Sequence, residues 1–241
     1  MGRKRRDSSS DAVYAALRIM SRNPRNAPAR PSGSSAHKPL PNRLRIIGGQ
    51  WRGVRITFPP LPALRPSPDR VRETLFNWLQ PVIVGARCLD LFAGSGALGI
   101  EALSRGASHV DFIDSEPAIG RHLLETLQRL DAANAAVRTA DALKFLDQRH
   151  AGGHYDVVFL DPPYASDLLL QVCNKLAAAD WLARGALIYL ECAADKPLPQ
   201  LPAAWQVHRS KRAGQVGYHL LHTGSGETSS VHANAVSNTD R

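Results

Sequence analysis

The sequence has few of the features of a metal, disulfide or membrane protein. Its three cysteines, Cys88, Cys173 and Cys192, are far apart and form no CxxC pair, so neither a disulfide framework nor a zinc site is expected. The nine histidines include no HExxH motif, and we predict no metal. No apolar run approaches the roughly 18 residues that cross a bilayer, and no signal peptide opens the chain. We therefore expect a cytoplasmic protein without a membrane anchor.

Acidic residues are scarce at the N-terminal end of the chain, where basic residues gather. Residues 1–45 hold eleven of the 30 Lys/Arg residues but two of the 21 Asp/Glu residues, so the remainder is electrically balanced. The net charge of +9 therefore does not by itself predict that the folded part binds nucleic acid. Local clusters could do so, although a solvated face is the alternative for each. Two clusters fit: Arg52, Arg55, Arg65, Arg70 and Arg72 beside Asp69 and Glu73, and His208, Arg209, Lys211 and Arg212.

Both ends of the chain have the composition of disordered segments. Residues 1–42 are rich in Arg, Ser and Pro and cannot bury enough apolar surface to fold alone, apart from a short helix predicted over 11–20. This basic arm is either a cytoplasmic extension or, because it is Arg-rich and acid-poor, an organellar transit peptide. Residues 223–241 are rich in Ser, Asn and Thr and are predicted to form a disordered tail.

Residues 43–80 predict a small extension made of a β-hairpin and a helix. The apolar runs 44–47 and 54–58 flank a Gly-Gly pair, which suits a turn between two strands. Ser67 and Pro68 are predicted to open the helix, with the serine as the capping residue and the proline at the first helical position. Apolar residues then recur on one face, so we expect the helix to continue to the end of the extension.

Residues 81–222 alternate between apolar runs and amphipathic segments, a pattern typical of α/β domains. The alternation predicts a seven-stranded, mostly parallel sheet with helices on both faces. The last two strands are joined by the short segment 211–214 and are predicted to form an antiparallel hairpin at one edge. Strands are expected at 87–92, 109–114, 136–139, 155–160, 186–191, 205–210 and 215–221, and helices at 97–105, 117–130, 141–148 and 167–178.

Four predicted strand ends carry groups that could bind a ligand, which in an open α/β sheet lies beyond the carboxyl ends of the strands. The first strand enters the sequence DLFAGSGALG, a glycine-rich turn between a strand and a helix. Gly94 and Gly96 permit positive φ and a close approach of the backbone to a ligand, whereas Gly99 permits close helix packing. This turn predicts a nucleotide site.

Two further strand ends supply carboxylates that suit the rest of a nucleotide. Asp114 follows Gly94 by twenty residues, a spacing at which an acid binds ribose hydroxyls. Asp141 suits acceptance of a hydrogen bond from an adenine amino group, or else it caps a helix, and it could do both. NAD and S-adenosylmethionine (SAM) fit these residues equally well.

The fourth strand end is the tetrapeptide Asp161-Pro162-Pro163-Tyr164, which follows the apolar run 155–160. The prolines fix φ and provide no N–H, so the loop is stiff and presents acceptors. Acceptors beside an aromatic ring suit a planar group with an exocyclic amine, although a polar turn is the simpler alternative. Hydride transfer has no evident use for such acceptors, whereas methyl transfer to an amine uses them directly. The tetrapeptide therefore favours SAM over NAD.

The chemistry that we expect at this tetrapeptide is positional. The lone pair of a base amine is delocalised into its ring, which makes the nitrogen a poor nucleophile. If the Asp161 carboxylate and the Pro162 carbonyl each hold one N–H, the nitrogen is biased toward pyramidal geometry and its lone pair points at the methyl group. The alkylated amine loses a proton readily, so Asp161 need not be a strong base. Tyr164 would stack on a base that is looped out or single-stranded.

Four segments together resemble the bacterial 16S rRNA (guanine(966)-N(2))-methyltransferase family. They are RIIGGQWRG at 45–53, LRPSPDRVRETLFNWL at 64–79, FAGSGALG at 92–99 and DPPY at 161–164, and the resemblance covers residues 43–221. Several kinds of amino-methyltransferase share DPPY, so the first two segments carry the family. The family often has Thr where this chain has Ser67. The resemblance implies a Rossmann-like class I SAM-dependent methyltransferase that forms N2-methylguanine in the 16S rRNA of the small ribosomal subunit or its assembly intermediate.

The resemblance also implies roles for individual residues. Asp90, Gly94 and Gly96 would hold the methionine part of SAM, Asp114 the ribose and Asp141 the adenine, with Phe92, Ser95 and Ala142 in the same turns. Asp161, Pro162, Pro163 and Tyr164 would hold the guanine. The candidate RNA contacts, from the resemblance and the two basic clusters, are Arg52, Arg65, Asp69, Arg70, Arg72, Lys211 and Arg212. Helix capping and surface ion pairs are the alternative for those next to the predicted helix.

Two other functions stay open at this point. One is a SAM-dependent methyltransferase that acts on another amine, such as adenine N6 of DNA or RNA or glutamine N5 of a protein. The other is a non-catalytic RNA-binding protein that keeps the fold and the basic arm. We expect a monomer that needs neither a metal nor a membrane.

Overall fold

A computed structural model describes residues 42–58, 67–148, 153–162 and 168–224. All of the described residues belong to one compact unit, Pro39–Arg241. Several predictions lie outside the described residues: the helix over 11–20, the tail from residue 225, and the placement of Arg65, Pro163 and Tyr164.

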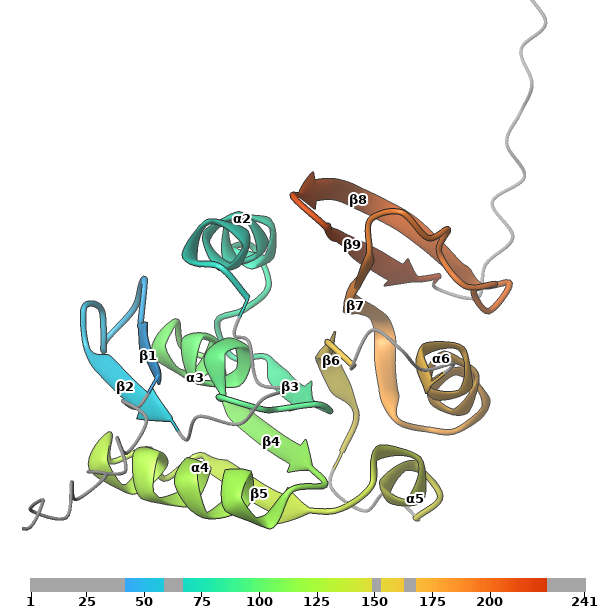
Figure 1. The fold of residues 1–241 in the computed structure, drawn as a ribbon. Coiled ribbons are helices and arrows are strands. Elements are labelled where there is room, and N and C mark those ends of the chain that lie inside the picture. The colour runs from blue at the N-terminus through green and yellow to red at the C-terminus, as the bar shows by residue number, and fades with distance from the viewer. Residues whose placement is uncertain (1–41, 59–66, 149–152, 163–167, 225–241) are drawn as a thin grey trace, which may run out of the picture. The chain divides into compact units, whose positions relative to one another are not determined.

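A seven-stranded sheet forms the centre of this unit, in the order β5-β4-β3-β6-β7-β9-β8 (Figure 1). Its parallel strands are β3 (Arg87–Asp90), β4 (His109–Asp114), β5 (Ala135–Thr139), β6 (Tyr155–Leu160) and β7 (Leu182–Ala193). β8 (Trp205–Ala213) and β9 (Val216–Thr223) form an antiparallel hairpin, and β9 is also antiparallel to β7. The strand order changes direction between β3 and β6. The carboxyl ends of these two strands therefore lie at the topological switch point where α/β sheets bind ligands.

Helices cover both faces of the sheet. α2 (Asp69–Leu79), α3 (Ala97–Ser104) and α4 (Pro117–Arg129) contribute apolar side chains to one buried cluster. α5 (Ala142–Leu146) and α6 (Leu168–Ala178) contribute to a second cluster and lie next to each other in Figure 1. Successive residues of β3, such as Cys88 and Leu89, belong to different clusters, so the clusters lie on opposite faces. The predicted mostly parallel sheet with an antiparallel edge hairpin is confirmed.

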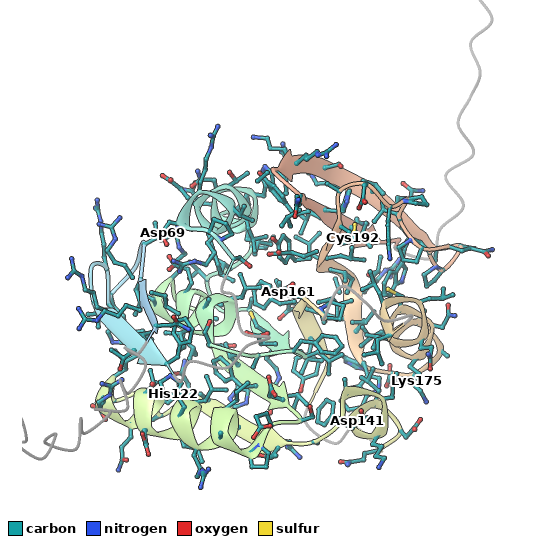
Figure 2. All side chains as sticks on the ribbon, viewed as in Figure 1. Asp69, His122, Asp141, Asp161, Lys175 and Cys192 are labelled. Carbon is teal, nitrogen blue, oxygen red and sulfur yellow. The ribbon has the colours of Figure 1, made fainter. Side chains whose placement is uncertain are left out.

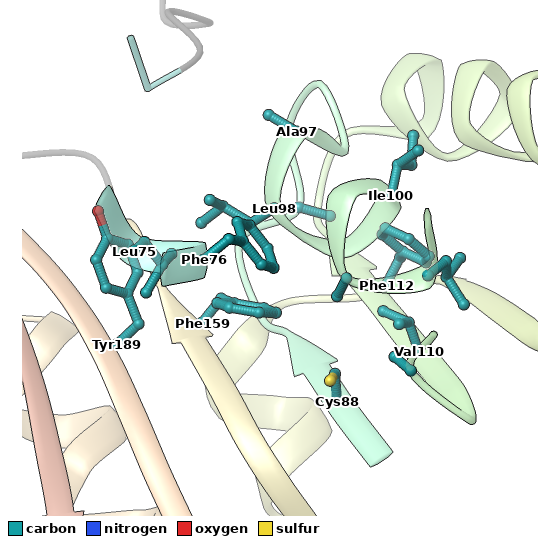
Figure 3. Packing of buried hydrophobic residues seen from close by; sticks show 14 of the residues in the cluster. Leu75, Phe76, Cys88, Ala97, Leu98, Ile100, Val110, Phe112, Phe159 and Tyr189 are labelled. Carbon is teal, nitrogen blue, oxygen red and sulfur yellow. The ribbon is translucent and has the colours of Figure 1, made fainter. Parts of the chain in front are cut away.

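The predicted extension before the sheet shares its hydrophobic core with the sheet. β1 (Asn42–Arg45) and β2 (Arg55–Phe58) pair as an antiparallel hairpin, and both contribute to the first cluster. Figure 3 shows Phe76 of α2 beside Phe159 of β6, with ring centroids 6.0 Å apart, and Tyr189 of β7 close by. The hairpin and α2 therefore complete one face of the sheet instead of forming a core of their own.

β7 is longer than the predicted strand 186–191, because it pairs with β6 on one side and β9 on the other. The predicted tail also begins one residue too early. Thr223 ends β9, is buried, and donates a hydrogen bond from its hydroxyl to the Ala186 carbonyl at 3.1 Å. Pairing with strands that are distant in the sequence extends both elements beyond their local apolar pattern.

The turn between β8 and β9 lies later than predicted. β8 continues to Ala213, so most of the segment 211–214 is strand, and the turn begins at Gly214 with φ of +60°. A glycine accepts this left-handed conformation without strain. The hairpin itself is confirmed.

Candidate active site

The glycine turn between β3 and α3 has the backbone geometry that the sequence predicts. Gly94 and Gly96 have φ of +50° and +77°, in the left-handed region, and Gly96 is the N-cap of α3. Gly99 lies against Phe112 of β4, where a Cβ atom would come within 2.2 Å of the ring. The helix that follows the turn therefore packs closely on the sheet, as expected.

Asp114, at the end of β4, holds this turn in place. Its Oδ2 accepts a hydrogen bond from the Gly94 N–H at 2.9 Å, and its Oδ1 accepts one from the Glu116 N–H at 2.9 Å. A carboxylate offers about four acceptor positions, so two backbone bonds leave capacity for hydroxyl donors. Asp114 thus joins two strand ends at the switch point and keeps the chemistry to bind a ribose.

Asp90, at the end of β3, is turned inward. It is 3% exposed and its Oδ2 accepts a hydrogen bond from the Gly99 N–H at 2.9 Å. Burial raises the pKa of Asp90 to about 7, the bond from Gly99 opposes that rise, and the Asp114 charge adds to it. Near neutral pH this carboxyl is therefore only partly ionised. Its contact with the methionine part of SAM stays a prediction.

Asp141 caps α5, as one of the two predicted roles requires. Its Oδ1 accepts a hydrogen bond from the Lys144 N–H at 3.0 Å. Figure 2 shows Asp141 at α5 and Asp161 at the end of β6. Asp141 is exposed, so its role toward adenine stays a prediction. Of the other residues predicted to hold SAM, Phe92 is half-buried and Ser95 and Ala142 are buried.

Asp161 follows the last residue of β6 directly, as predicted. It is half-buried and Pro162 is buried. Burial raises the pKa of Asp161 well above its usual range, and the charges of Glu191 and Asp90 raise it further, whereas a hydrogen bond from the Ser67 side chain lowers it. The carboxyl that we predict to hold the substrate amine therefore has a high proton affinity.

Ser67 does not cap α2, so that prediction is wrong. Pro68 is the N-cap residue, and none of the described side chains caps the helix there. The Ser67 hydroxyl instead donates to Oε1 of Glu191 on β7, at 2.5 Å. The Tyr189 hydroxyl donates to the same oxygen at 2.7 Å. Ser67, which its position before Pro68 predicts to be a helix cap, thus lies beside Asp161 and Glu191 instead.

Glu191 is a residue of this site that sequence reasoning missed. It is 2% exposed and lies within β7, next to Asp161. A signal was available, because Glu191 is the last residue of the predicted strand 186–191, and a carboxylate at a strand end is the feature that singled out Asp114. Glu191 is thus a fifth carboxylate at a predicted strand end, beside the four strand ends that the sequence singles out.

The predicted RNA contacts are not all on the surface. Arg72 is 1% exposed, and its guanidinium lies 2.6 Å from the Asp69 carboxylate and 3.6 Å from that of Glu101. A buried guanidinium held by two carboxylates does not reach RNA, so the prediction of a direct RNA contact at Arg72 is wrong. The ion-pair alternative holds for Arg72 and Asp69. The exposed members of the set are Arg52, Asp69, Arg70, Lys211 and Arg212.

Two elements that carry residues of the predicted basic clusters, α2 and β8, lie next to each other. Trp78 of α2 stacks on Tyr218 of β9, with ring centroids 5.6 Å apart. The Lys211 ammonium of β8 lies 5.9 Å from the Trp78 ring, within reach of a cation–π interaction. The C-terminal end of α2 therefore contacts the β8–β9 hairpin through Trp78, and Arg70 and Lys211 are exposed on these two neighbouring elements.

The loop between β1 and β2 docks on the C-terminal end of α3. The N–H groups of Ile47 and Gly48 each donate to the Glu101 carboxylate at 2.8 Å. Gly49 has φ of +78°, and a Cβ atom there would lie 1.7 Å from the Ser104 carbonyl oxygen. The Gly-Gly pair of the RIIGGQWRG segment is therefore required by a close approach of two backbones.

Neither a metal centre nor a membrane span is found in the part of the chain that the structure describes. Within those residues, no group of three or more His, Cys, Asp or Glu side chains is placed to hold a metal ion. No helix among them is long and apolar enough to cross a membrane.

Comparison with known proteins places the chain in a family. A family profile described as "Conserved hypothetical protein 95" matches residues 44–222. "Ribosomal RNA small subunit methyltransferase D" of Escherichia coli (strain K12) is 52% identical over 178 residues, which cover 74% of this chain and 89% of that protein. The chain belongs to this family. It is a methyltransferase, which confirms the predicted enzyme class and family resemblance.

Solved structures agree with this assignment. "Putative methyltransferase yhhF from Escherichia coli" is 49% identical, with a TM-score of 0.71 over 76% of this chain and 99% of that one. "A putative sam-dependent methyltransferase from Streptococcus mutans" has a TM-score of 0.57 at 16% identity, over 70% of this chain and 53% of that one, and so shares the fold alone. The predicted Rossmann-like fold of SAM-dependent methyltransferases is confirmed.

Proposed function

We propose that this methyltransferase transfers the methyl group of SAM to the exocyclic N2 amine of a guanine in 16S rRNA, at position 966 by the family resemblance. The observation that carries the substrate is the 52% identity to a protein named for the small-subunit rRNA, because it extends over 178 residues and 89% of that protein. The substrate is the small ribosomal subunit or its assembly intermediate, and the enzyme acts as a monomer in the cytoplasm.

The residues at the switch point suit SAM. The left-handed turn at Gly94 and Gly96 lets the backbone approach a ligand closely. Asp114 would accept from the ribose hydroxyls and Asp141 from the adenine amino group, each with acceptor capacity beyond its backbone bonds. SAM supplies an electrophilic methyl group when bound.

The amine acceptor and the glycine turn lie at the carboxyl ends of neighbouring strands. β3 and β6 are parallel partners, with Asp90 opposite Phe159. Adjacent strands are about 4.8 Å apart, so Asp161 at the end of β6 lies beside the turn that follows β3. This arrangement supports a transfer between a ligand on the turn and an amine held by Asp161.

Asp161 and Pro162 would act on the nucleophile by position. The Asp161 carboxylate would accept one N–H of the guanine amine and the Pro162 carbonyl the other, which biases the nitrogen lone pair out of conjugation with the ring. The amine becomes acidic once it is alkylated, and Asp161 would take its surplus proton. The raised pKa of Asp161, caused first by burial and then by the Glu191 and Asp90 charges, favours that uptake.

The exposed basic residues around the site would hold the RNA backbone. Arg70 on α2 and Lys211 and Arg212 on β8 belong to neighbouring elements, and Arg52 lies on the loop between β1 and β2. Contacts of Lys and Arg with phosphates position a nucleic acid without reading its sequence. The target guanine would still have to leave its stack to reach Asp161.

The test is a methylation assay with methyl-labelled SAM and small subunits from cells that lack the protein. We expect label in 16S rRNA, and N2-methylguanosine after digestion. Asp161→Ala should abolish the label while SAM affinity, measured by calorimetry, is retained, because alanine has no oxygen to hold the amine or to take its proton. Asp156→Asn, on the exposed far end of the same strand, is the control and should keep the activity.

Two outcomes would contradict the proposal. Label in adenine, or in protein glutamine instead of RNA, would overturn the substrate. Full activity of Asp161→Ala would overturn the role of the carboxylate. Mass spectrometry of 16S rRNA from cells with and without the protein would identify the target nucleotide directly.

A further inference from the structure

Glu191 is a buried carboxylate whose charge acts on Asp161 but which takes no proton in the proposed mechanism. In the parallel pair β6–β7, Leu160 lies opposite Leu190, so Asp161 and Glu191 are the next two residues along the same register. Neighbouring residues of a parallel pair project from the same face of a sheet. Phe159 and Tyr189, two residues earlier, have ring centroids 6.4 Å apart in the cluster that α2 covers (Figure 3). Both carboxyl groups therefore face α2.

The Ser67 hydroxyl connects these two carboxyl groups. It donates to Oε1 of Glu191 at 2.5 Å and is also a hydrogen-bond partner of Asp161. The Ser67 backbone is fixed, because its carbonyl accepts a hydrogen bond from the buried Arg72 guanidinium at 3.3 Å. A hydroxyl has one proton and two acceptor lone pairs, so Ser67 donates to one group at a time. It donates to Asp161 when that carboxyl is ionised, and to Glu191 when Asp161 is protonated and itself donates to Ser67. This geometry is that of a proton bridge.

We propose that Asp161, Ser67 and Glu191 form one proton-sharing unit, in which Ser67 and Glu191 are positioning residues that set how readily Asp161 gains and loses a proton. This inference rests on the proposed function of Asp161. The alkylated amine releases a proton from N2 to an Asp161 oxygen, and the N–H bonding pair stays on nitrogen. Asp161 then passes a proton to Ser67 Oγ, whose own proton moves to Glu191 Oε1. Ser67 ends the step unchanged and the pair holds one additional proton.

The charges around Asp161 agree with a shared proton. Burial raises the pKa of Asp161 most, and the Glu191 charge on β7 and then the Asp90 charge on β3 raise it further. The hydrogen bond from Ser67 lowers the pKa because it stabilises the ionised form. Glu191 and Ser67 therefore act on Asp161 in opposite directions, which an experiment can separate.

The remaining titratable groups around the unit act as donors or are already paired. Burial, the Glu191 charge and its hydrogen bond raise the pKa of Tyr189, so the hydroxyl stays protonated and donates; Asp161 and Tyr218 raise that pKa further. Burial and the Glu191 charge raise the pKa of the Cys192 thiol. Arg72, the cation of α2 beside Ser67, is held by the carboxylates of Asp69 and Glu101.

Substitutions at the two positioning residues should move the titration of Asp161 in opposite directions. Glu191→Gln removes the charge but keeps an oxygen that accepts from Ser67 and Tyr189, so the midpoint of Asp161 should fall by about 1 pH unit or more. Ser67→Ala removes the stabilising hydrogen bond, so the midpoint should rise. Ser67→Thr keeps the hydroxyl and should keep the wild-type midpoint.

The measurement is 13C NMR of the full chain labelled at the aspartate carboxyl carbons, with the Asp161 signal assigned from its loss in Asp161→Asn. Glu125→Gln, on the exposed side of α4, is the matched control and should leave the midpoint unchanged. Midpoints that stay fixed in both positioning variants, or that move in the same direction, would overturn the proposal. If Glu191→Gln does not fold, the comparison of Ser67→Ala with Ser67→Thr decides the matter alone.

The pH dependence of single-turnover methylation gives a second readout. The acid limb of the rate should move to lower pH in Glu191→Gln and to higher pH in Ser67→Ala, because the reaction requires ionised Asp161. A purely structural role would lower the rate by the same factor at every pH, which would overturn the proposal. A wild-type protein that methylates no guanine would contradict the proposed function instead, and the NMR midpoints of the free protein would still test the unit.

Discussion

Asp90 is a residue whose surroundings oppose its own charge. It lies at the end of β3, is 3% exposed, and has Gly99 N–H as its hydrogen-bond donor. Burial outweighs that bond and, with the Asp114 charge, brings the pKa of Asp90 from 3.8 to about 7. The folded state therefore binds a proton that the unfolded chain releases, so this carboxyl favours folding in acid and opposes it in base.

We predict that Asp90→Asn changes how stability depends on pH. The folded pKa of Asp90 lies above the unfolded one, so its favourable contribution is complete below pH 4 and is lost as the pH rises to about 7. The loss is on the order of 4 kcal/mol, at 1.36 kcal/mol for each pH unit. Asn cannot ionise but still accepts from Gly99, so the variant should gain stability over the wild type across this range. Urea unfolding between pH 4.5 and 8 measures the difference.

A suitable control for this prediction is Asp195→Asn, at an exposed position after β7. Its unfolding free energy should follow the wild-type curve at every pH. Parallel curves for Asp90→Asn and the wild type would show that Asp90 is ionised at all pH values in this range, against the prediction.

Among the single elements, α3 connects the glycine turn to the RIIGGQWRG loop. The helix begins at Gly96 and ends at Ser104, where the loop is docked. Glu101 is fully buried in this helix and accepts on both oxygens: Oε2 from the Ile47 N–H, and Oε1 from the Gly48 N–H and the Arg105 guanidinium. One helix thus connects two of the four segments that carry the family resemblance.

We predict that Glu101→Gln destabilises the protein by about 3–5 kcal/mol, the usual effect of breaking a buried ion pair on one side. Both Glu101 oxygens face donors, so the amide nitrogen of Gln would have to face one of them. The buried Arg72 guanidinium would also lose the carboxylate at 3.6 Å. Urea unfolding gives the free energy, and hydrogen exchange should become faster at the amides of Ile47 and Gly48.

Glu125→Gln, an exposed change of the same kind on α4, should stay within about 0.5 kcal/mol of the wild type. Equal effects of the two substitutions would mean that the docked loop contributes little to stability. Faster exchange confined to the docked loop would instead locate the loss at this contact.

Across the whole molecule, the order and type of the elements were predictable because each buried strand carries its own apolar pattern. β4 and β6 end where they were expected, because the apolar pattern of each stops at a carboxylate, Asp114 or Asp161, that is followed by a loop. β7 is longer than expected because its ends are set by pairing with β9, which local sequence does not show. Elements defined by their partners are therefore the least predictable from sequence.

The candidate site was predictable where a residue lies at the end of its own strand, as Asp114 and Asp161 do. It was not predictable where a residue acts through a distant partner. Ser67 was assigned to a helix start because its bond to Glu191 spans 124 residues of sequence. Arg72 was predicted to contact RNA because the sequence around it does not show that its guanidinium pairs with the buried Glu101 carboxylate.

The basic N-terminal arm is expected to affect how the whole molecule binds RNA. Residues 1–42 contain nine Lys/Arg and two Asp/Glu residues. If these cations meet phosphates, deletion of 1–42 should reduce the dependence of log affinity on log salt concentration by up to about 6, since each contact with single-stranded RNA contributes roughly 0.7. Filter binding to 16S rRNA at several salt concentrations measures the slope.

Deletion of residues 225–241 is the control for the arm, because that segment holds Glu227, Asp240 and Arg241 and has no basic excess. It should leave the salt slope unchanged. An unchanged slope after removal of residues 1–42 would mean that the arm does not contact the RNA backbone.

β8 is the outermost strand on its side of the sheet, and its residues 206–212 are exposed. Such an edge offers N–H and C=O groups to a strand of any other chain, which is a common route to aggregation. Arg209, Lys211 and Arg212 place positive charge along this edge. A second copy that approached edge to edge would meet the same charges and be repelled. The cations proposed to hold RNA thus also disfavour pairing of β8 with the β8 strand of a second copy.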